Sequence, residues 1–256
     1  MTNNVYQPEE LLAAIDTAAV SADLKNTLKA LVPTLEPLLP HLSNRNQLLT
    51  AHYFNFLLRE VTAVTVETYW WELHMALIKQ VARDQEAGQP LLTVMMQLEP
   101  QLQEHFGPRG AVTLQKINSK TVRGICRLSE TLVDPQDMFV APNAHSLAQA
   151  YFVPHAWVRA VYAGRTPVGF IMLADNDQTQ EYFLWRYMVA APFQGHGYGR
   201  AAINLLVAYV RTRPGAKELL VSCVPHPQGP YDFYVKCGFV DTGKIIEGEI
   251  VLKMVL

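Results

Sequence analysis

The sequence predicts an α+β protein, in which a mixed sheet with helices on both faces follows an all-α N-terminal domain. Apolar residues recur at helical spacing through residues 1–107, whereas residues 111–256 alternate short β-branched or aromatic runs with turn residues. The turn-forming segment Gly107-Pro108-Arg109-Gly110 separates the two patterns. We therefore expect a helical domain at 1–107 and an α+β domain at 111–256.

The first domain is expected to consist of successive helices. Pro8 suits a first helical turn, and Ser21 can cap a second helix. Residues 46–86 contain no proline or glycine, so they predict one bent helix or two, and Pro90 can start another. Three prolines are expected to break the chain after the second helix: Pro33, Pro37 and Pro40.

The aromatic cluster Tyr69-Trp70-Trp71 with His74 lies inside the long helical stretch. It could line a pocket for a substrate, but aromatic residues at helical spacing more often pack in a core. The expected buried stripe of the helix after Pro90 is Leu91, Leu92, Met95, Leu98 and Leu102.

The second domain is expected to begin as a meander of strands and to continue with alternating helices and strands. The expected strands are Val112–Ile117, Trp157–Tyr162, Val168–Ala174, Tyr182–Val189, Leu219–Val224, Phe239–Asp241 and Ile246–Met254. The expected helices are Lys120–Ser129, Leu147–Phe152, Ala201–Arg211 and one that contains Tyr234.

A glycine-rich loop joins the expected strand at 182–189 to the expected helix at 201–211. Backbone N–H groups at a helix N-terminus are unpaired and attract anions, and glycine lets the backbone approach a ligand closely. No Gly-Lys-Ser/Thr follows, so the loop is no Walker A motif, and its spacing does not match G-x-G-x-x-G. A pyrophosphate is the expected ligand of the loop, which consists of Gln194, Gly195, His196, Gly197, Tyr198, Gly199 and Arg200.

This loop resembles the Q/R-x-x-G-x-G/A motif of the GNAT superfamily of acyl-CoA-dependent N-acyltransferases, in which it holds the pyrophosphate of coenzyme A. A second segment, Phe233–Phe239, resembles the family's F/L-Y-x-x-x-G-F motif. The resemblance implies acetyl-CoA as cosubstrate and Tyr234 as the acid that protonates the departing thiolate. A phenol, with an ordinary pKa of about 10, suits that role. Tyr231 is the alternative acid.

Two further segments resemble bacterial diamine or spermidine N-acetyltransferases of this superfamily, over residues 112–256. They are Val140-Ala141-Pro142-Asn143-Ala144 and Trp185-Arg186-Tyr187-Met188. The resemblance implies a small amine, possibly a polyamine, as acceptor. It places the substrate near Phe139, Asn143, Glu181 and Trp185. It also implies that the strand edge at Tyr187, Met188 and Val189 pairs with pantetheine and supplies an oxyanion donor.

The residue that takes the proton of the attacking amine stays open at this point. Acidic residues that could attract a cationic amine or relay its proton are Glu130, Asp134, Asp137 and Glu181, although such residues are usually only solvated.

One departure from the family pattern concerns coenzyme A binding. The family usually has an asparagine seven residues before the tyrosine, and Pro227 stands there. His226 or Gln228 could substitute for it. The alternatives are therefore a non-catalytic acyl-CoA-binding or sensing protein, and an acetyltransferase for aminoglycoside or protein amines.

Composition excludes several other classes. The 256 residues carry a formal net charge of −2 without a basic cluster, so no nucleic-acid partner is expected. No apolar run approaches the roughly 20 residues that cross a bilayer, so no membrane partner is expected. The three cysteines predict free thiols in a reducing cytoplasm, and the histidines show no metal-ligand spacing, so no metal is expected. A homodimer is possible.

Overall fold

The computed structural model describes residues 8–18, 20–43, 45–47, 49–50, 53, 77, 89–106, 110–132 and 134–256. Contacts between Cα atoms divide the chain into two units, residues 1–108 and 109–256. The aromatic cluster at 69–71 with His74 lies outside the described residues, as does most of the expected helix at 46–86 and all of the expected linker except Gly110.

The described part of the first unit is helical, as predicted. Its elements are α1 (Pro8–Thr17), α2 (Ala22–Leu35), the short 3-10 helix η1 (Leu39–His41) and α5 (Gln89–Phe106). Ser21 is confirmed as the cap of α2, since its Oγ accepts a hydrogen bond of 3.2 Å from the Leu24 N–H. The expected break at Pro33 is wrong: α2 continues to Leu35. Proline removes one hydrogen bond near the helix end, and burial of Val32 and Leu35 offsets that loss.

The second unit is built on a mixed sheet of seven strands in the order β1-β2-β3-β4-β5-β7-β6, which confirms the predicted fold class. All neighbouring strands are antiparallel except β4 and β5, which are parallel. The strands are β1 (Val112–Gln115), β2 (Ala156–Ala163), β3 (Thr166–Asn176), β4 (Glu181–Val189), β5 (Glu218–Cys223), β6 (Val240–Ile246) and β7 (Glu249–Val255).

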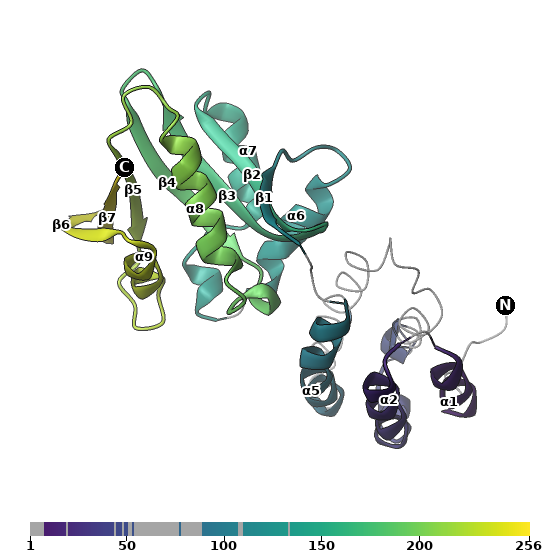
Figure 1. The fold of residues 1–256 in the computed structure, drawn as a ribbon. Helices are drawn as coiled ribbons and strands as arrows, with labels where there is room; N and C mark the ends of the chain where they lie inside the picture. Colours follow the sequence, from purple (N-terminus) through teal and green to yellow (C-terminus); the bar gives the residue numbers. More distant parts are fainter. Residues whose placement is uncertain are drawn as a thin grey trace. The chain divides into compact units, whose positions relative to one another are not determined.

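Helices flank this sheet, with α8 in front of it and α7 behind it in Figure 1. The helices are α6 (Val122–Leu128), α7 (Asn143–Phe152), α8 (Tyr198–Val210) and α9 (Tyr231–Cys237). Short 3-10 helices lie at Ser129–Thr131, Gln136–Met138 and Ala191–Phe193. One apolar stripe of α8 is buried, consisting of Ala202, Ile203, Leu206, Val207 and Val210.

Two expected boundaries in this unit are wrong. Helix α7 begins at Asn143, four residues earlier than expected, with Pro142 at the N-cap position. Ile246 ends β6 and does not open β7, because Glu247 (φ 52°) and Gly248 (φ 84°) form the turn between these strands. A two-residue hairpin turn needs positive φ at both positions, which glycine adopts readily and glutamate rarely, so the turn was not evident from the sequence.

A β-bulge in β4 opens the sheet. Met172 of β3 pairs with Arg186 and Leu173 pairs with Leu184, which leaves Trp185 as the extra residue of β4. Strands β4 and β5 pair only at Phe183↔Leu220 and Leu184↔Val221. The part of β4 that follows Leu184 therefore does not pair with β5. Bulges bend a strand and increase its twist. Consequently the C-terminal half of β4 diverges from β5 and leaves a gap between two parallel strands.

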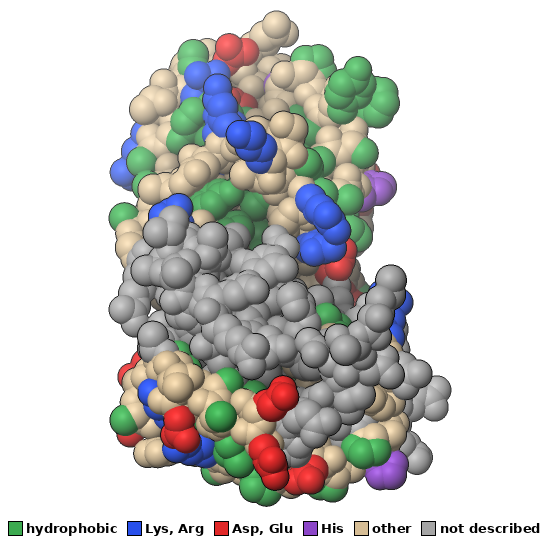
Figure 2. Space-filling view, turned by 90° about the vertical axis from the view of Figure 1, so that its right-hand side faces the viewer, with side chains coloured by type: hydrophobic (Ala, Val, Ile, Leu, Met, Phe, Trp, Pro, Cys, Tyr) green, Lys and Arg blue, Asp and Glu red, His purple; other side chains and the backbone are tan. Residues whose placement is uncertain are grey.

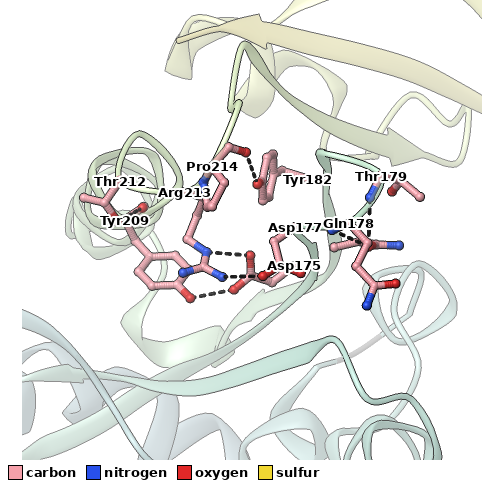
Figure 3. Close-up of polar contacts among 10 residues, drawn as sticks. Asp175, Asp177, Gln178, Thr179, Tyr182, Tyr209, Thr212, Arg213 and Pro214 are labelled. Atoms are coloured by element: carbon pink, nitrogen blue, oxygen red, sulfur yellow. Dashed lines mark hydrogen bonds and ion pairs between the residues drawn. The ribbon is translucent and has the colours of Figure 1, made fainter.

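A polar cluster joins the C-terminal end of α8 to the C-terminal end of β3 (Figure 3). The Tyr209 hydroxyl donates to Asp175 Oδ2 at 2.6 Å, and Arg213 Nε lies 2.8 Å from Asp175 Oδ1. Nearby, the Tyr182 hydroxyl donates to the Pro214 carbonyl at 2.6 Å. The Asp175 side chain is only 8% exposed, so both of its charge-assisted bonds are shielded from water. The cluster therefore holds the end of α8 that lies away from the glycine-rich loop.

On the face drawn in Figure 2, Lys and Arg side chains lie in several places among apolar and neutral groups. Among the helices of the described ranges, none combines the length and the apolar character that a membrane crossing requires.

Asp175 and Asp177 offer a matched test of the polar cluster. Asp175→Ala should lower the free energy of unfolding by about 1–3 kcal/mol, because it leaves Tyr209 and Arg213 without their shared partner. Asp177→Ala should change it by less than about 0.5 kcal/mol, since the Asp177 carboxylate is 56% exposed and lies 4.0 Å from Arg213. Urea unfolding of both full-length variants measures the difference. Equal losses would contradict the anchoring role of Asp175.

Candidate active site

A cavity of about 700 Å³ lies where β4 and β5 diverge. It is lined by Leu184–Val189 of β4, by the ends of β5 and α9, by the glycine-rich loop and by the segment before α7. The unpaired edge of β4 faces this gap, so its backbone groups can bond a ligand that lies between the strands.

The glycine-rich loop forms one end of the cavity. Gly197 is the N-cap residue of α8 with φ 80°, and Gly195 has φ 79°, conformations that side chains rarely permit. A Cβ atom built on either glycine would meet no atom within 4 Å, so it would project into open space. The loop thus presents bare backbone at the positive end of the α8 dipole, which fits a pyrophosphate.

Two cationic side chains lie at this end of the cavity. Arg200 and Lys236 are exposed and line the cavity, and Arg200 Nη2 donates to the Lys236 carbonyl at 3.0 Å. This bond ties the first turn of α8 to α9. The two side chains add positive charge where the helix N-terminus already favours an anion.

Gly199 is required by close packing. A Cβ there would lie 3.2 Å from the Phe233 ring and 3.3 Å from the Tyr187 hydroxyl. Tyr187 donates to the Gly199 carbonyl at 2.9 Å, and its ring stacks on Phe233 at 6.0 Å between centroids. The Tyr187 side chain therefore connects β4, the loop and α9, while its backbone borders the cavity together with Met188 and Val189.

The remaining loop residues differ in where they point. Gln194 lines the cavity, donates to the Val189 carbonyl at 3.0 Å and exchanges hydrogen bonds with the Gln136 amide. His196 does not line the cavity. Its Nδ1 lies 2.8 Å from the Gln194 carbonyl oxygen, and its ring stacks on Tyr198. Tyr198 is also outside the lining set.

Tyr234 contributes a phenol to the lining of the cavity. The residue is 5% exposed, and Cys223 also lines this space. Burial raises the pKa of Tyr234 well above its usual value, and Cys223, Cys237 and Glu249 add to the rise. The phenol is therefore protonated at neutral pH and can donate. Tyr231, the alternative acid, does not line the cavity; its hydroxyl donates to Asp241 Oδ2 at 3.2 Å.

The four expected substrate residues do not come together. Phe139 and Trp185 line the cavity. Asn143 is fully buried and outside the lining set; its Nδ2 donates to the Ile125 carbonyl at 2.8 Å. Glu181 is exposed at the start of β4, where it accepts from the Thr179 hydroxyl. None of the acidic candidates lines the cavity: Glu130, Asp134, Asp137 and Glu181.

Of the two residues beside Pro227 that could replace the family's asparagine, one lines the cavity. Gln228 lines it, whereas His226 does not and instead packs against the Phe139 ring, 5.1 Å between centroids. Gln228 is therefore the better placed of the two candidates for the amide that Pro227 cannot supply.

Among the lining residues that were not predicted as site residues, Arg186, Ser222 and Glu249 carry polar or charged side chains. Glu249 opens β7, and its Oε2 accepts a hydrogen bond from the Ser222 hydroxyl on β5. Burial, followed by Glu249 and Asp241, raises the pKa of the neighbouring Cys223 thiol to about 11. Arg186 lies in the Trp185–Met188 segment but was given no role there, whereas Ser222 and Glu249 belong to no local motif and are brought together only by the pairing of β5 with β7.

Within the described ranges, no group of three or more His, Cys, Asp or Glu residues is arranged to hold a metal ion.

Comparison with solved structures found similar chains, among them the following three. The chain is 17% identical to an acetyltransferase from Thermus thermophilus (TM-score 0.47; 58% of this chain, 99% of that chain covered). It is 15% identical to the microcin C7 self-immunity acetyltransferase solved with acetyl-CoA and AMP (TM-score 0.45; 59% and 96%). It is 19% identical to a dodecameric spermidine N-acetyltransferase from Vibrio cholerae (TM-score 0.43; 57% and 92%).

Comparison with curated proteins by sequence found no match. Residues 127–239, however, match the sequence model of the acetyltransferase (GNAT) family. This segment includes the bulged β4, the glycine-rich loop, α8, β5 and α9. The chain therefore contains a GNAT acetyltransferase domain at residues 127–239.

Proposed function

We propose that this protein is an acetyl-CoA-dependent N-acetyltransferase that acts on a primary amine. The observation that carries the proposal is that the anion-binding loop at Gly195–Gly199 and the Tyr234 phenol border one cavity, in the gap between β4 and β5. Pyrophosphate at the loop would direct the rest of coenzyme A along the open edge of β4 toward Tyr234.

The residues of the cavity suit direct transfer to an amine. Backbone N–H groups of β4 near Tyr187–Val189 can bond the developing oxyanion. The Tyr234 phenol can give its proton to the departing sulfur, since it is buried and protonated. A protein that only bound or sensed acyl-CoA would not need an acid at this position, so Tyr234 favours catalysis over sensing.

The identity of the amine is tested with a panel. Release of coenzyme A thiol from acetyl-CoA is measured with spermidine, aminoglycosides, amino acids and peptide amines. The proposal requires acetylation of at least one amine. Tight acetyl-CoA binding without transfer to any of them would instead support the sensing alternative.

Gly197→Glu should abolish acetyl-CoA binding, because a carboxylate side chain would project into the space assigned to the pyrophosphate. Calorimetric titration with acetyl-CoA measures this effect. Gly243→Glu is the matched control, since Gly243 also has positive φ (72°) and no atom within 4 Å of a Cβ, but lies outside the cavity. If Gly197→Glu binds as tightly as the control, the loop is only a turn.

Tyr234→Phe should lower kcat by about 10² to 10⁴ while leaving acetyl-CoA affinity nearly unchanged, because it removes only the proton donor. Tyr231→Phe serves as control and should keep full kcat. Since burial places the pKa of Tyr234 above its usual 10, ionisation of this phenol should cause no loss of kcat below about pH 10. Full kcat in Tyr234→Phe would indicate that solvent, and not Tyr234, protonates the departing sulfur.

A further inference from the structure

Two opposite charges stand in the cavity away from the glycine-rich loop. Apart from Arg200 and Lys236 near the loop, the charged residues that line the cavity in the described part of the chain are Arg186 and Glu249. They lie on opposite sides of the gap, Arg186 on β4 and Glu249 on β7 beside β5. A ligand that enters the gap therefore meets one cation and one anion.

Arg186 forms no direct ion pair with the described residues. Its Nη1 donates to the Trp185 carbonyl at 2.8 Å, and its Nη2 reaches the Gln149 side-chain oxygen at 3.5 Å. Its Nε is buried and has no hydrogen-bond partner among the described residues, and the ion pairs found there do not include Arg186. This guanidinium therefore has an N–H donor without an acceptor. A planar carboxylate suits it, because a carboxylate can accept two parallel hydrogen bonds from one guanidinium.

Glu249 is suited to an ammonium group. The carboxylate is half-buried, and the Ser222 hydroxyl holds one of its oxygens, which leaves the rest of its acceptor capacity toward the cavity. It is also close enough to Tyr234 and Arg186 to influence both of them electrostatically. A carboxylate in this position can take a proton from an amine near the phenol.

We propose that the acceptor is an amine that also carries a carboxylate, such as an amino acid, with Arg186 binding its carboxylate and Glu249 its ammonium group. The proposal rests on the proposed acetyltransferase function. A polyamine fits less well, because its second cationic nitrogen would meet Arg186, and like charges in a partly buried cavity repel.

Glu249 would also take part in the proton balance. The ammonium loses one proton to the Glu249 carboxylate, which later releases it to solvent. The free amine then forms the N–C bond as the C–S bond breaks. Tyr234 gives its proton to the sulfur, and the second amine proton restores the phenol through solvent. The products are the N-acetyl amino acid and the coenzyme A thiol, with one proton released overall.

The first experiment compares each amino acid with its own carboxamide as acceptor. The two share the amine and side chain and differ in the carboxylate. The carboxamide has the less basic amine, so kcat/KM is compared over a pH range that spans both amine pKa values, which separates the effect of amine basicity from that of the missing carboxylate. For the best acceptor, kcat/KM should be about 30- to 100-fold higher for the amino acid, as expected for a lost charge-assisted pair.

The second experiment compares two arginines that make similar local contacts. Arg186→Gln should raise KM for the amino acid about 30- to 100-fold and leave KM for its carboxamide unchanged. Arg159→Gln is the control. Arg159 Nη1 likewise donates to the preceding carbonyl (2.7 Å), and burial lowers the pKa of both guanidinium groups, but Arg159 lies outside this cavity. Its variant should keep both KM values.

Calorimetric titration of the same amino acid into protein saturated with coenzyme A gives a readout that does not depend on turnover. Binding should be lost in Arg186→Gln and kept in Arg159→Gln. The inference is overturned if spermidine or another amine without a carboxylate is the best acceptor, or if Arg186→Gln affects amino acid and carboxamide equally. Failure of every amine to be acetylated, with amino acid binding intact, would overturn the proposed function alone.

Discussion

The cavity depends on one irregularity of the sheet, the extra residue Trp185 in β4. A regular β4 would continue its parallel pairing with β5 beyond Leu184 and Val221, and the two strands would satisfy each other's backbone groups. The bulge instead bends β4 away, so its edge and the Tyr234 phenol face a common space. An open edge inside a sheet is otherwise unfavourable, because unpaired N–H and C=O groups need partners. A ligand with amide groups along its length can supply them.

Helix α8 connects this space to the rest of the domain through both of its ends. Its N-terminal end carries Gly197 and Gly199, where bare backbone and close packing against Phe233 and Tyr187 fix the loop. Its C-terminal end is held at Asp175 through Tyr209 and Arg213. Anion binding at a helix N-terminus depends on the direction of the first-turn N–H groups. The distant polar cluster thus contributes to the geometry of the loop.

Local patterns in the sequence predicted which helices and strands form and where the two motif segments lie, but they misplaced some boundaries and did not predict the contacts between strands. The alternation of apolar runs and turns predicted the strands of the sheet, and apolar residues at helical spacing predicted the helix at 201–211, which begins three residues earlier at Tyr198. The bulge at Trp185 was not predictable, because it is defined by the register with β3. Likewise Glu249 acquires its place from the β5–β7 pairing, 27 residues from its partner Ser222. Asn143, expected at the substrate, packs in the interior under Ile125 and Met188.

In the proposed mechanism, Tyr234 would act as an acid and Glu249 as a base in the same cavity. Burial raises the pKa of the phenol, which keeps it protonated but also makes it a weaker acid. The same shielding from water raises the basicity of a thiolate that forms beside it, because both anions lose solvation alike. The difference between the pKa of the phenol and the pKa of the thiol, which controls proton transfer, is thereby preserved. Glu249 opposes ionisation of Tyr234 as long as it is charged, and this opposition weakens once its carboxylate has taken the proton of an amine. Protonation of Glu249 would therefore make Tyr234 a better acid at the moment when the sulfur leaves.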